Sequence, residues 1–363
     1  MYSSSSHHTG HRCLFSVRPH MRPFIIPVFI THQGCPHRCI FCNQHSITGQ
    51  PAQANGTAPS AVRKTIDEWL ARPKKIPEAP VQVAFYGGSF TGLKKTLQAR
   101  LLKAVQPYIQ SGRVETIRLS TRPDYVDHDT PSFLRKHGVG CVELGVQSLS
   151  PDVLAACGRE YSEICVKKAV GYLKSAGLLV GVQIMIGLPR ETTSGLIESV
   201  QRIVALKPDF ARIYPTLVIR GSGLHLLYAN GQYKPLSMNQ AIARTMRVKK
   251  IFSDHGIKVI RMGLQHTEVL EKEVVAGPYH PAFGELVLSR SSFTTLRKNL
   301  VQVPDGRVQG VSIAPADLSI LRGFKNSNMK QLAVLGLLEK MEIILNPKQD
   351  RYTITIEDVT KNF

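Results

Sequence analysis

Three cysteines in one short segment are the residues whose types and spacing most clearly indicate chemistry. Cys35, Cys39 and Cys42 lie within eight positions in the pattern Cys-x3-Cys-x2-Cys, directly after an apolar segment. Three thiolates on one loop can each bind one iron of a four-iron, four-sulfur cubane, whereas an all-cysteine ligand set needs a fourth thiolate. No suitable fourth cysteine is evident nearby in the sequence. The motif therefore predicts a [4Fe-4S] cluster with one iron left open.

An iron left open can bind a small molecule through an amino and a carboxylate group, and the pattern suggests S-adenosylmethionine (SAM) as that ligand. A zinc site is the alternative, because zinc also takes clustered thiolates and could recruit His37 or His45. We expect the iron–sulfur cluster, with Phe41 of the same loop among the residues that contact SAM.

The remaining cysteines and the apolar segments indicate the compartment. Seven cysteines in a chain without an apolar export signal point to a reducing environment, so we expect a cytoplasmic protein. Cys141, Cys157 and Cys165 are scattered and are expected to be structural. The longest apolar run, residues 24–30, is far shorter than the roughly 20 residues that span a membrane. We therefore expect no membrane partner.

The net charge of the chain is +20, which favours a polyanionic partner such as RNA. The basic residues are spread along the chain instead of forming one block. A generic solvated basic surface therefore stays open as the alternative.

A glycine-containing loop follows the apolar segment 81–86 and provides a second candidate site. It consists of Gly87, Gly88 and Ser89. Paired glycines expose backbone groups and permit a ligand to approach closely. Because α/β barrels build their sites at the carboxyl ends of their strands, we expect this loop to bind the methionyl end of SAM.

Charged and polar residues occur inside or directly after other apolar segments. Glu143 lies within such a segment, where a charge needs a partner, so a catalytic role inside the barrel and a structural ion pair both stay open. Tyr214, close to Arg212, ends another segment and is a candidate to face the substrate, with ordinary packing as the alternative. Arg122 and Asp124 are close enough in sequence to pair with each other.

The elements that must position these residues alternate between apolar, β-branched segments and longer helical patterns. This alternation is typical of a parallel sheet with crossover helices. We expect strands at residues 24–31, 81–86, 114–120, 139–145, 179–186 and 210–215, with 258–264 as a possible seventh. We expect helices at residues 60–71, 94–109, 131–137, 162–175, 191–205 and 237–255. These units predict the α/β class and a partial (β/α)6 TIM-like barrel.

The organisation along the chain predicts three regions. Residues 1–22 are expected to be a disordered polar tail, in which His7, His8, His11 and Cys13 offer a less favoured metal cluster. Residues 23–266 are expected to form the barrel domain, and residues 267–363 a small C-terminal α/β appendage. Within the appendage, residues 322–328 mix cations, an aromatic ring and amides, which suit RNA contact, although a solvated turn explains them as well.

Several motifs in the same order resemble a known family. They are the cysteine loop, Gly87-Gly88-Ser89-Phe90, and the segments 120–124, 143–148, 187–189 and 212–217. Over about residues 24–265 the chain resembles the radical SAM domain of the Elongator catalytic-subunit family, in a stand-alone form without the acetyltransferase domain. Two departures are visible: those subunits have a longer spacing between the first two cysteines, and no cysteine follows Cys165 to form their later zinc site.

A second resemblance concerns the SAM site. Gln147 within Gly-Val-Gln, Arg159 twelve positions later, and Gln183 before Gly-Leu-Pro are similar to motifs of the oxygen-independent coproporphyrinogen oxidases. The resemblance implies that Gln147 and Gln183 bind the ribose hydroxyls of SAM and that Arg159 binds its carboxylate through charge-assisted hydrogen bonds. Gln183 replaces an Asp of those oxidases.

The resemblances imply an enzyme that reductively cleaves SAM to a 5′-deoxyadenosyl radical, with an electron from an external flavodoxin- or ferredoxin-type donor. The implied substrate is RNA, above all tRNA, because Elongator catalytic subunits modify wobble uridine. Two alternatives stay open. One is a radical SAM enzyme for a small-molecule or tetrapyrrole substrate, and the other is a non-catalytic iron–sulfur protein that binds RNA or acts as a sensor.

Overall fold

The computed structural model describes residues 23–30, 33–35, 39–43, 46–47, 57–74 and 76–358. The expected tail at residues 1–22 lies outside the described residues, as do His37 and His45.

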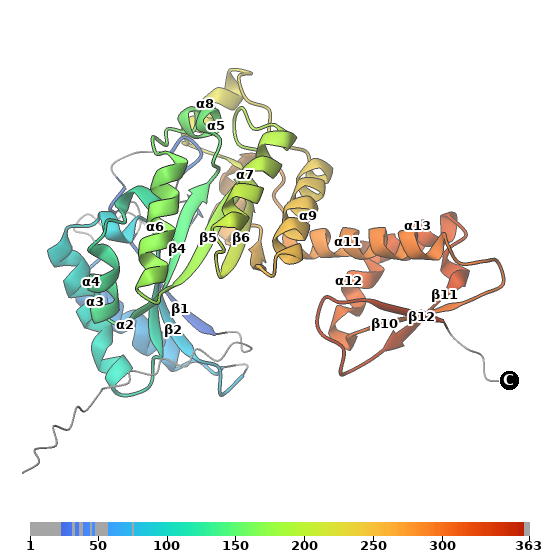
Figure 1. Cartoon of the computed structure of the whole chain (residues 1–363), viewed down its shortest axis with the longest axis horizontal. Helices are drawn as coiled ribbons and strands as arrows, with labels where there is room; N and C mark the ends of the chain where they lie inside the picture. Colours follow the sequence, from blue (N-terminus) through green and yellow to red (C-terminus); the bar gives the residue numbers. More distant parts are fainter. Residues whose placement is uncertain are drawn as a thin grey trace, which may run out of the picture.

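A curled sheet of seven parallel strands forms the larger part of the molecule (Figure 1). Its order is β1-β2-β3-β4-β5-β6-β8, so the strands are neighbours in the order of the chain. They are β1 (Phe24–Phe29), β2 (Val81–Tyr86), β3 (Thr116–Thr121), β4 (Val139–Gln147), β5 (Leu179–Ile186), β6 (Phe210–Pro215) and β8 (Lys258–Met262). Within the described residues β1 and β8 each pair with one strand only, so the barrel stays open. The predicted partial barrel is confirmed, and the possible seventh strand is part of it.

Helices pack on the outer face of this sheet (Figure 1). They are α2 (Pro59–Leu70), α3 (Lys95–Gln110), α4 (Thr130–Lys136), α6 (Glu163–Ser175), α7 (Thr193–Ala205) and α9 (Met238–Asp254). The start of α9 has the expected cap, because the Ser237 side chain accepts from the Gln240 backbone N–H and the Gln240 side chain accepts from Ser237. Gly256, with φ of 72°, ends this segment as a left-handed residue, which favours glycine.

Short helices at the carboxyl ends of the strands were not expected from the sequence. They are α5 (Pro151–Ala156), α8 (Gly223–Ala229) and α10 (Glu268–Glu273). Each is seven residues or shorter, so periodicity could not identify it. A small antiparallel pair of β7 (Val218–Ile219) and β9 (Val274–Ala276) lies at the same end. These elements build the rim around the site.

The strands divide their residues between two faces. Outward residues such as Ile117, Leu119 and Val142 are apolar and join the core beneath the helices. On the concave face, polar residues from different strands meet, among them Glu143 of β4 and Arg212 of β6. The near-continuous burial of the strands therefore has two different causes, an apolar core outside and an ionic network inside.

A small α/β unit follows the barrel. Its sheet has the order β11-β10-β12, from β10 (Gln309–Ile313), β11 (Met341–Leu345) and β12 (Thr355–Asp358). The helices α11 (Phe283–Leu300), α12 (Leu318–Arg322) and α13 (Ser327–Val334) accompany it (Figure 1). In α11, Phe283 and Val287 belong to the barrel core, whereas Phe293 and Leu296 belong to the core of the small unit. This one helix is therefore shared by both hydrophobic cores.

None of the helices in the described part of the chain is both long enough and apolar enough to cross a membrane.

Candidate active site

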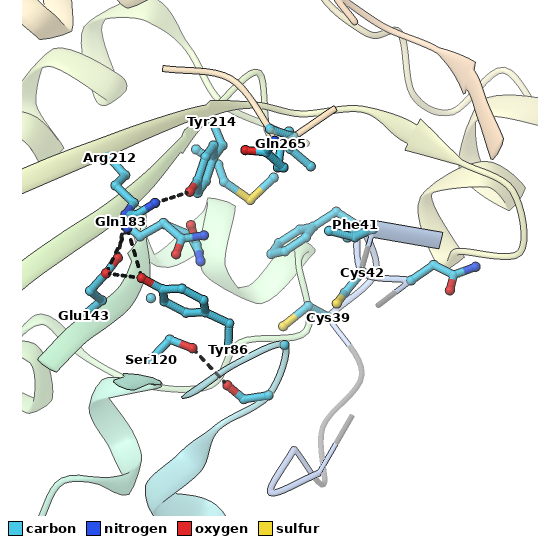
Figure 2. A pocket seen from close by; sticks show the side chains of 18 of the residues that line it. Cys39, Phe41, Cys42, Tyr86, Ser120, Glu143, Gln183, Arg212, Tyr214 and Gln265 are labelled. Atoms are coloured by element: carbon cyan, nitrogen blue, oxygen red, sulfur yellow. Dashed lines mark hydrogen bonds and ion pairs between the residues drawn. The ribbon is translucent and has the colours of Figure 1, made fainter. Parts of the chain in front are cut away.

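A cavity of about 1310 Å³ lies at the carboxyl ends of the strands. It brings together all the residues that the sequence assigned to the cluster, to SAM or to catalysis: Cys35, Cys39, Phe41, Cys42, Gly87, Gly88, Ser89, Glu143, Gln147, Arg159, Gln183 and Tyr214. Figure 2 shows Cys39, Phe41 and Cys42 on one side of the cavity and Glu143 and Tyr214 on the opposite side. These residues therefore share one cavity, and the role of each in binding or catalysis stays a prediction.

The cysteine loop is attached to the rim by backbone hydrogen bonds. The Ile40 N–H donates to the Cys157 carbonyl at 3.3 Å, and the Ile40 carbonyl accepts from the Leu224 N–H at 2.6 Å. The Asn43 side-chain amide donates to the Arg220 carbonyl at 2.8 Å. The ends of α5 and α8 therefore hold the loop over the cavity.

Glycines allow the cysteine loop and the glycine loop to pack backbone against backbone. A Cβ atom on Gly34 would lie 2.1 Å from the Ser89 carbonyl oxygen, and one on Gly88 would lie 2.5 Å from that of Gln33. The Ser89 N–H also donates to the Gln33 carbonyl at 3.2 Å. Gly88 is thus required by the protein's own packing, a reason that the sequence did not indicate.

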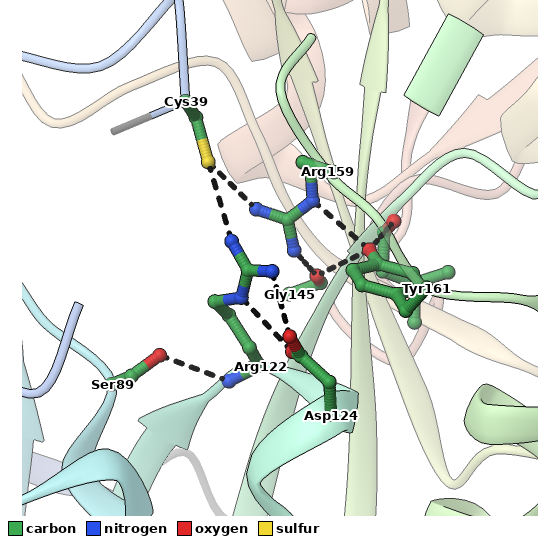
Figure 3. Close-up of polar contacts among 8 residues, drawn as sticks. Cys39, Ser89, Arg122, Asp124, Gly145, Arg159 and Tyr161 are labelled. Atoms are coloured by element: carbon green, nitrogen blue, oxygen red, sulfur yellow. Dashed lines mark hydrogen bonds and ion pairs between the residues drawn. The ribbon is translucent and has the colours of Figure 1, made fainter. Parts of the chain in front are cut away.

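Two buried guanidinium groups approach the thiol of Cys39 (Figure 3). Nη1 of Arg159 lies 3.1 Å from Sγ of Cys39, and Nη1 of Arg122 lies 3.8 Å from it. Both groups place positive charge and N–H donors beside this thiol. Burial raises the pKa of the Cys35 thiol, and hydrogen bonds with Ser89 partly oppose that effect.

Neighbouring groups fix both guanidinium groups in place. Nε of Arg159 donates to the Tyr161 hydroxyl at 3.0 Å, and that hydroxyl donates to the Val146 carbonyl at 2.6 Å. Burial raises the pKa of Tyr161 to about 12, so its hydroxyl keeps the proton it donates. Arg122 and Asp124 form the expected pair, with two hydrogen bonds of 2.9 and 2.7 Å.

Gln147 has an unusual backbone and an unpaired polar atom. Its φ is 63°, at a bulge where β4 pairs with β5. A non-glycine residue in this region costs roughly 1–3 kcal/mol and often marks a functional site. The side chain is buried, and its Oε1 has no hydrogen-bond partner within the described residues. A carbonyl oxygen in this state can accept a hydrogen bond from a ligand hydroxyl in the cavity. Gln183 lies on the adjacent strand β5 and also lines the cavity.

Glu143 is the centre of an ion network on the concave face, which we define as Tyr86, Arg118, Glu143 and Arg212. Oε1 of Glu143 accepts from the Tyr86 hydroxyl, from Nη1 of Arg118 and from Nη2 of Arg212, each at 2.9 Å. Burial raises the pKa of Tyr86, and the neighbouring carboxylate raises it further, so the phenol stays protonated. The structural ion pair is therefore present, and a catalytic role for Glu143 stays a prediction.

Tyr214 both packs and lines the cavity. Its ring is partly buried against the apolar cluster that contains Met185 and Leu188, and Phe41 packs on the same cluster. Its hydroxyl accepts a hydrogen bond of 3.4 Å from Nη1 of Arg212. A position beside the ion network and facing the cavity is compatible with substrate contact, which stays a prediction.

The sequence did not indicate the residues at the end of β8 and directly after it, although they line the cavity. Arg261 in β8 and Gln265 and His266 after it are among them. Arg261 donates to the Gly263 carbonyl at 3.1 Å and to Oε1 of Gln265 at 2.6 Å. A run of polar residues after the seventh strand was the available signal. It was missed because that strand was considered only as an extension of the sheet.

The chemistry of the side chains that line the cavity fits an iron–sulfur cluster. Thiolates are the ligands of such clusters, and three of them leave one iron of a cubane open. Three thiols, two guanidinium groups and an unpaired amide oxygen in one cavity match a [4Fe-4S] cluster with SAM.

Two family models match the chain. The Radical SAM superfamily model matches residues 29–203, and the Radical_SAM C-terminal domain model matches residues 208–292. Together they span most of the barrel and end within α11.

Curated relatives and a solved structure agree with this match. A tRNA uridine(34) acetyltransferase of Methanocaldococcus jannaschii is 27% identical over 298 residues, which cover 72% of this chain and 54% of that protein. Elongator complex protein 3 of Homo sapiens is 24% identical over 301 residues, which cover 68% of this chain and 54% of that protein. The chain thus spans about half the length of these relatives.

The solved structure is the archaeal Elp3 of Methanocaldococcus infernus with an N-terminal deletion. It superposes with a TM-score of 0.56 at 22% identity and covers 76% of this chain and 63% of that chain. This similarity shows that the fold is the same.

Proposed function

The chain belongs to the radical SAM superfamily, and from this premise we propose that it cleaves SAM reductively at a [4Fe-4S] cluster and uses the radical to modify RNA, above all tRNA. Enzymes of this superfamily use such a cluster together with SAM. One observation carries the proposal: three cysteine thiols, buried Arg159 and the unpaired Oε1 of Gln147 line the same cavity.

Different residues of the cavity are assigned to the cluster and to SAM. Cys35, Cys39 and Cys42 would hold the cluster, and Arg159, already 3.1 Å from Cys39 Sγ, would bind the SAM carboxylate beside it. Gln147 would accept from a ribose hydroxyl. Further SAM contacts are assigned to Phe41, Gly87, Gly88, Ser89 and Gln183.

The cluster, held by the three cysteines, would supply the electron for the reductive cleavage of SAM, and the cleaved SAM would supply the radical chemistry for the substrate. The electron comes from an external donor of flavodoxin or ferredoxin type. The protein's own part is to position SAM, to exclude water and to orient the substrate. The substrate would enter between the cysteine loop and Tyr214, which lie on opposite sides of the cavity (Figure 2).

An RNA substrate is supported by charge as well as by the names of the relatives. The net charge is +20. Four arginines line the cavity, namely Arg122, Arg159, Arg212 and Arg261, whereas Glu143 is the one acidic residue among the described residues that line it. Arg122 and Arg212 pair with Asp124 and Glu143. Arg159 and Arg261 form no ion pair with any described residue, and their positive charge suits an anionic substrate.

The test is to measure 5′-deoxyadenosine from SAM, with and without tRNA, after anaerobic reconstitution and reduction. We expect tRNA to stimulate cleavage and to compete for binding better than heparin or duplex DNA of matched charge. Equal competition without stimulation would exclude RNA as the preferred substrate and favour a small molecule. Binding of RNA without any product would favour the non-catalytic iron–sulfur protein.

A further inference from the structure

A series of aromatic residues runs from the C-terminal unit to the cavity, and its two middle members, Tyr279 and His280, are consecutive in the sequence. Phe324, between α12 and α13, is 61% exposed. Its ring centroid lies 6.1 Å from that of His280, with the two planes at 79°. His280 follows Tyr279, whose hydroxyl lies 2.7 Å from Nδ1 of His266, and His266 lines the cavity. We call Phe324, His280, Tyr279 and His266 the aromatic track.

The turn that carries Phe324 is held in an unfavourable backbone conformation. Lys325 and Asn326 have φ of 51° and 62°, the left-handed region that non-glycine residues rarely adopt. The buried Asn328 side chain fixes the turn, because its Nδ2 donates to the Ser289 carbonyl at 3.0 Å and to the Leu321 carbonyl at 2.9 Å. Strained backbone persists where the surrounding structure enforces it, often at binding sites. The turn therefore displays Phe324 in a fixed position.

Uncompensated positive charge surrounds this turn. Arg322, Lys325 and Lys330 form no ion pair within the described residues, and Nζ of Lys325 lies 5.5 Å from the Phe324 ring centroid. The nearby carboxylate of Asp317 already pairs with Arg351. An exposed aromatic ring next to cations that form no ion pair suits a ligand that carries both a flat ring and negative charge.

We propose that the aromatic track binds unpaired nucleotides of an RNA substrate, with a base stacked on Phe324 and phosphates near Arg322 and Lys325. The bound strand then leads towards the cavity along His280, Tyr279 and His266. This inference rests on the proposed function, since it takes RNA as the substrate. Because stacking needs a free base face, the track favours single-stranded over duplex RNA.

The direct test compares Phe324→Ala and Phe324→Trp in the full-length protein. Binding of a fluorescently labelled anticodon stem-loop RNA is measured by anisotropy. Phe324→Ala should weaken binding about 5- to 150-fold, the equivalent of the about 1–3 kcal/mol per base of aromatic stacking. Phe324→Trp should bind like the wild type. Tyr352→Ala, at a 43% exposed aromatic residue of the same unit, is the control and should leave binding unchanged.

The dependence of RNA affinity on salt concentration distinguishes base stacking from phosphate contacts. Arg322→Ala and Lys325→Ala should each make the log–log slope of affinity against salt shallower by about 0.7, the value for one phosphate contact with a single strand. Phe324→Ala should keep the wild-type slope, because stacking releases no counterions. A fully paired RNA of matched length should bind more weakly and respond little to Phe324→Ala.

The outcomes separate this inference from the proposed function. A wild-type protein that prefers tRNA, together with a Phe324→Ala variant that binds equally well, would overturn the aromatic track alone. An equal loss on single-stranded and duplex RNA would overturn it too. A wild-type protein without any preference for RNA over heparin would overturn both proposals. Melting temperatures of the variants should match the wild type because Phe324 is mostly exposed.

Discussion

Arg159, beside the cysteine loop, and the two arginines of the ion network are held in different ways. On the side of the cysteine loop, Arg159 donates to the Cys39 thiol and to backbone, partners that a ligand can replace. On the opposite side, Arg118 and Arg212 share the one carboxylate of Glu143. The first arrangement leaves N–H donors available for a cofactor, whereas in the second the arginines and the carboxylate neutralise each other. The comparison indicates that the cysteine side binds the cofactor and that the ion network stabilises the fold.

The largest effect is expected at the cysteines. Cys35→Ala, Cys39→Ala and Cys42→Ala should each abolish the cluster, because two thiolates would leave two of its four irons without a protein ligand. Iron content and absorbance after anaerobic reconstitution measure this. Cys141→Ala, at a buried cysteine of β4, is the control and should keep the wild-type iron content. Retention of iron in any of the three variants would contradict the ligand assignment.

Removing the carboxylate of the ion network should mainly reduce stability. Glu143→Gln leaves two guanidinium groups buried without their counter-ion, which should lower the free energy of unfolding by about 3–5 kcal/mol. Denaturant unfolding monitored by circular dichroism measures this. The control is Glu198→Gln, at an exposed pair with Arg202, for which we expect a loss of less than about 1 kcal/mol. If Glu143→Gln keeps full stability but loses turnover, the carboxylate is catalytic and the comparison fails.

Substitutions beside the cysteine loop should reduce SAM binding and leave the fold intact. Arg159→Ala and Gln147→Ala should each weaken SAM binding by about 1–3 kcal/mol, since each removes a charged or buried hydrogen bond. Equilibrium dialysis on the reconstituted protein gives the affinity, and iron content reports the cluster. Arg113→Ala, at an exposed arginine after α3, serves as the matched control. Unchanged affinity in both variants would mean that SAM is bound by other residues.

A smaller effect, which depends on pH, is expected at Glu191. The carboxylate of this residue has one cationic partner, whereas that of Glu143 has two. Oε1 of Glu191 accepts from the Gly187 N–H and from Nη1 of Arg244, and burial raises its pKa to about 7. The folded state then holds this proton more tightly than the unfolded state, whose pKa is about 4.5. Stability from this group should therefore fall as the pH rises from about 4.5 to 7, by at most about 1.4 kcal/mol per pH unit.

Glu191→Gln checks this prediction, because an amide does not titrate. Denaturant unfolding of the wild type and the variant at several pH values should show a shallower fall for the variant. Parallel curves would contradict the assignment to Glu191.

Motifs at strand ends could be found from the sequence, whereas contacts between strands could not. The cysteine spacing, the glycine pair and Gln147 were visible because each belongs to a short local pattern. Arg118 and Tyr86 were missed because their importance comes from the register that places them beside Glu143, one strand and two strands away respectively. The alternation of side chains along β2 and β3 indicates which residues share a face of the sheet, but it does not reveal which polar residues are in contact.

The same limit applies to the C-terminal unit. Residues 322–328 stood out as a mixed basic and aromatic segment, and a solvated turn was an equal explanation. The left-handed backbone of Lys325 and Asn326 and the contact of Phe324 with His280 depend on packing against α11, which no local pattern reports. Similarly, the division of α11 between two cores could not be seen from its apolar residues alone.

The central claim is that the cysteine side of the cavity is a SAM-cleaving site, and the formation of 5′-deoxyadenosine tests it most directly. The wild-type protein, reconstituted anaerobically and reduced, should form 5′-deoxyadenosine from SAM. Cys39→Ala should form none, and Arg159→Ala should keep its iron but form much less at low SAM concentration. A stable zinc occupant without iron-dependent absorbance, or a loaded and reduced cluster that forms no 5′-deoxyadenosine even with tRNA present, would contradict the claim.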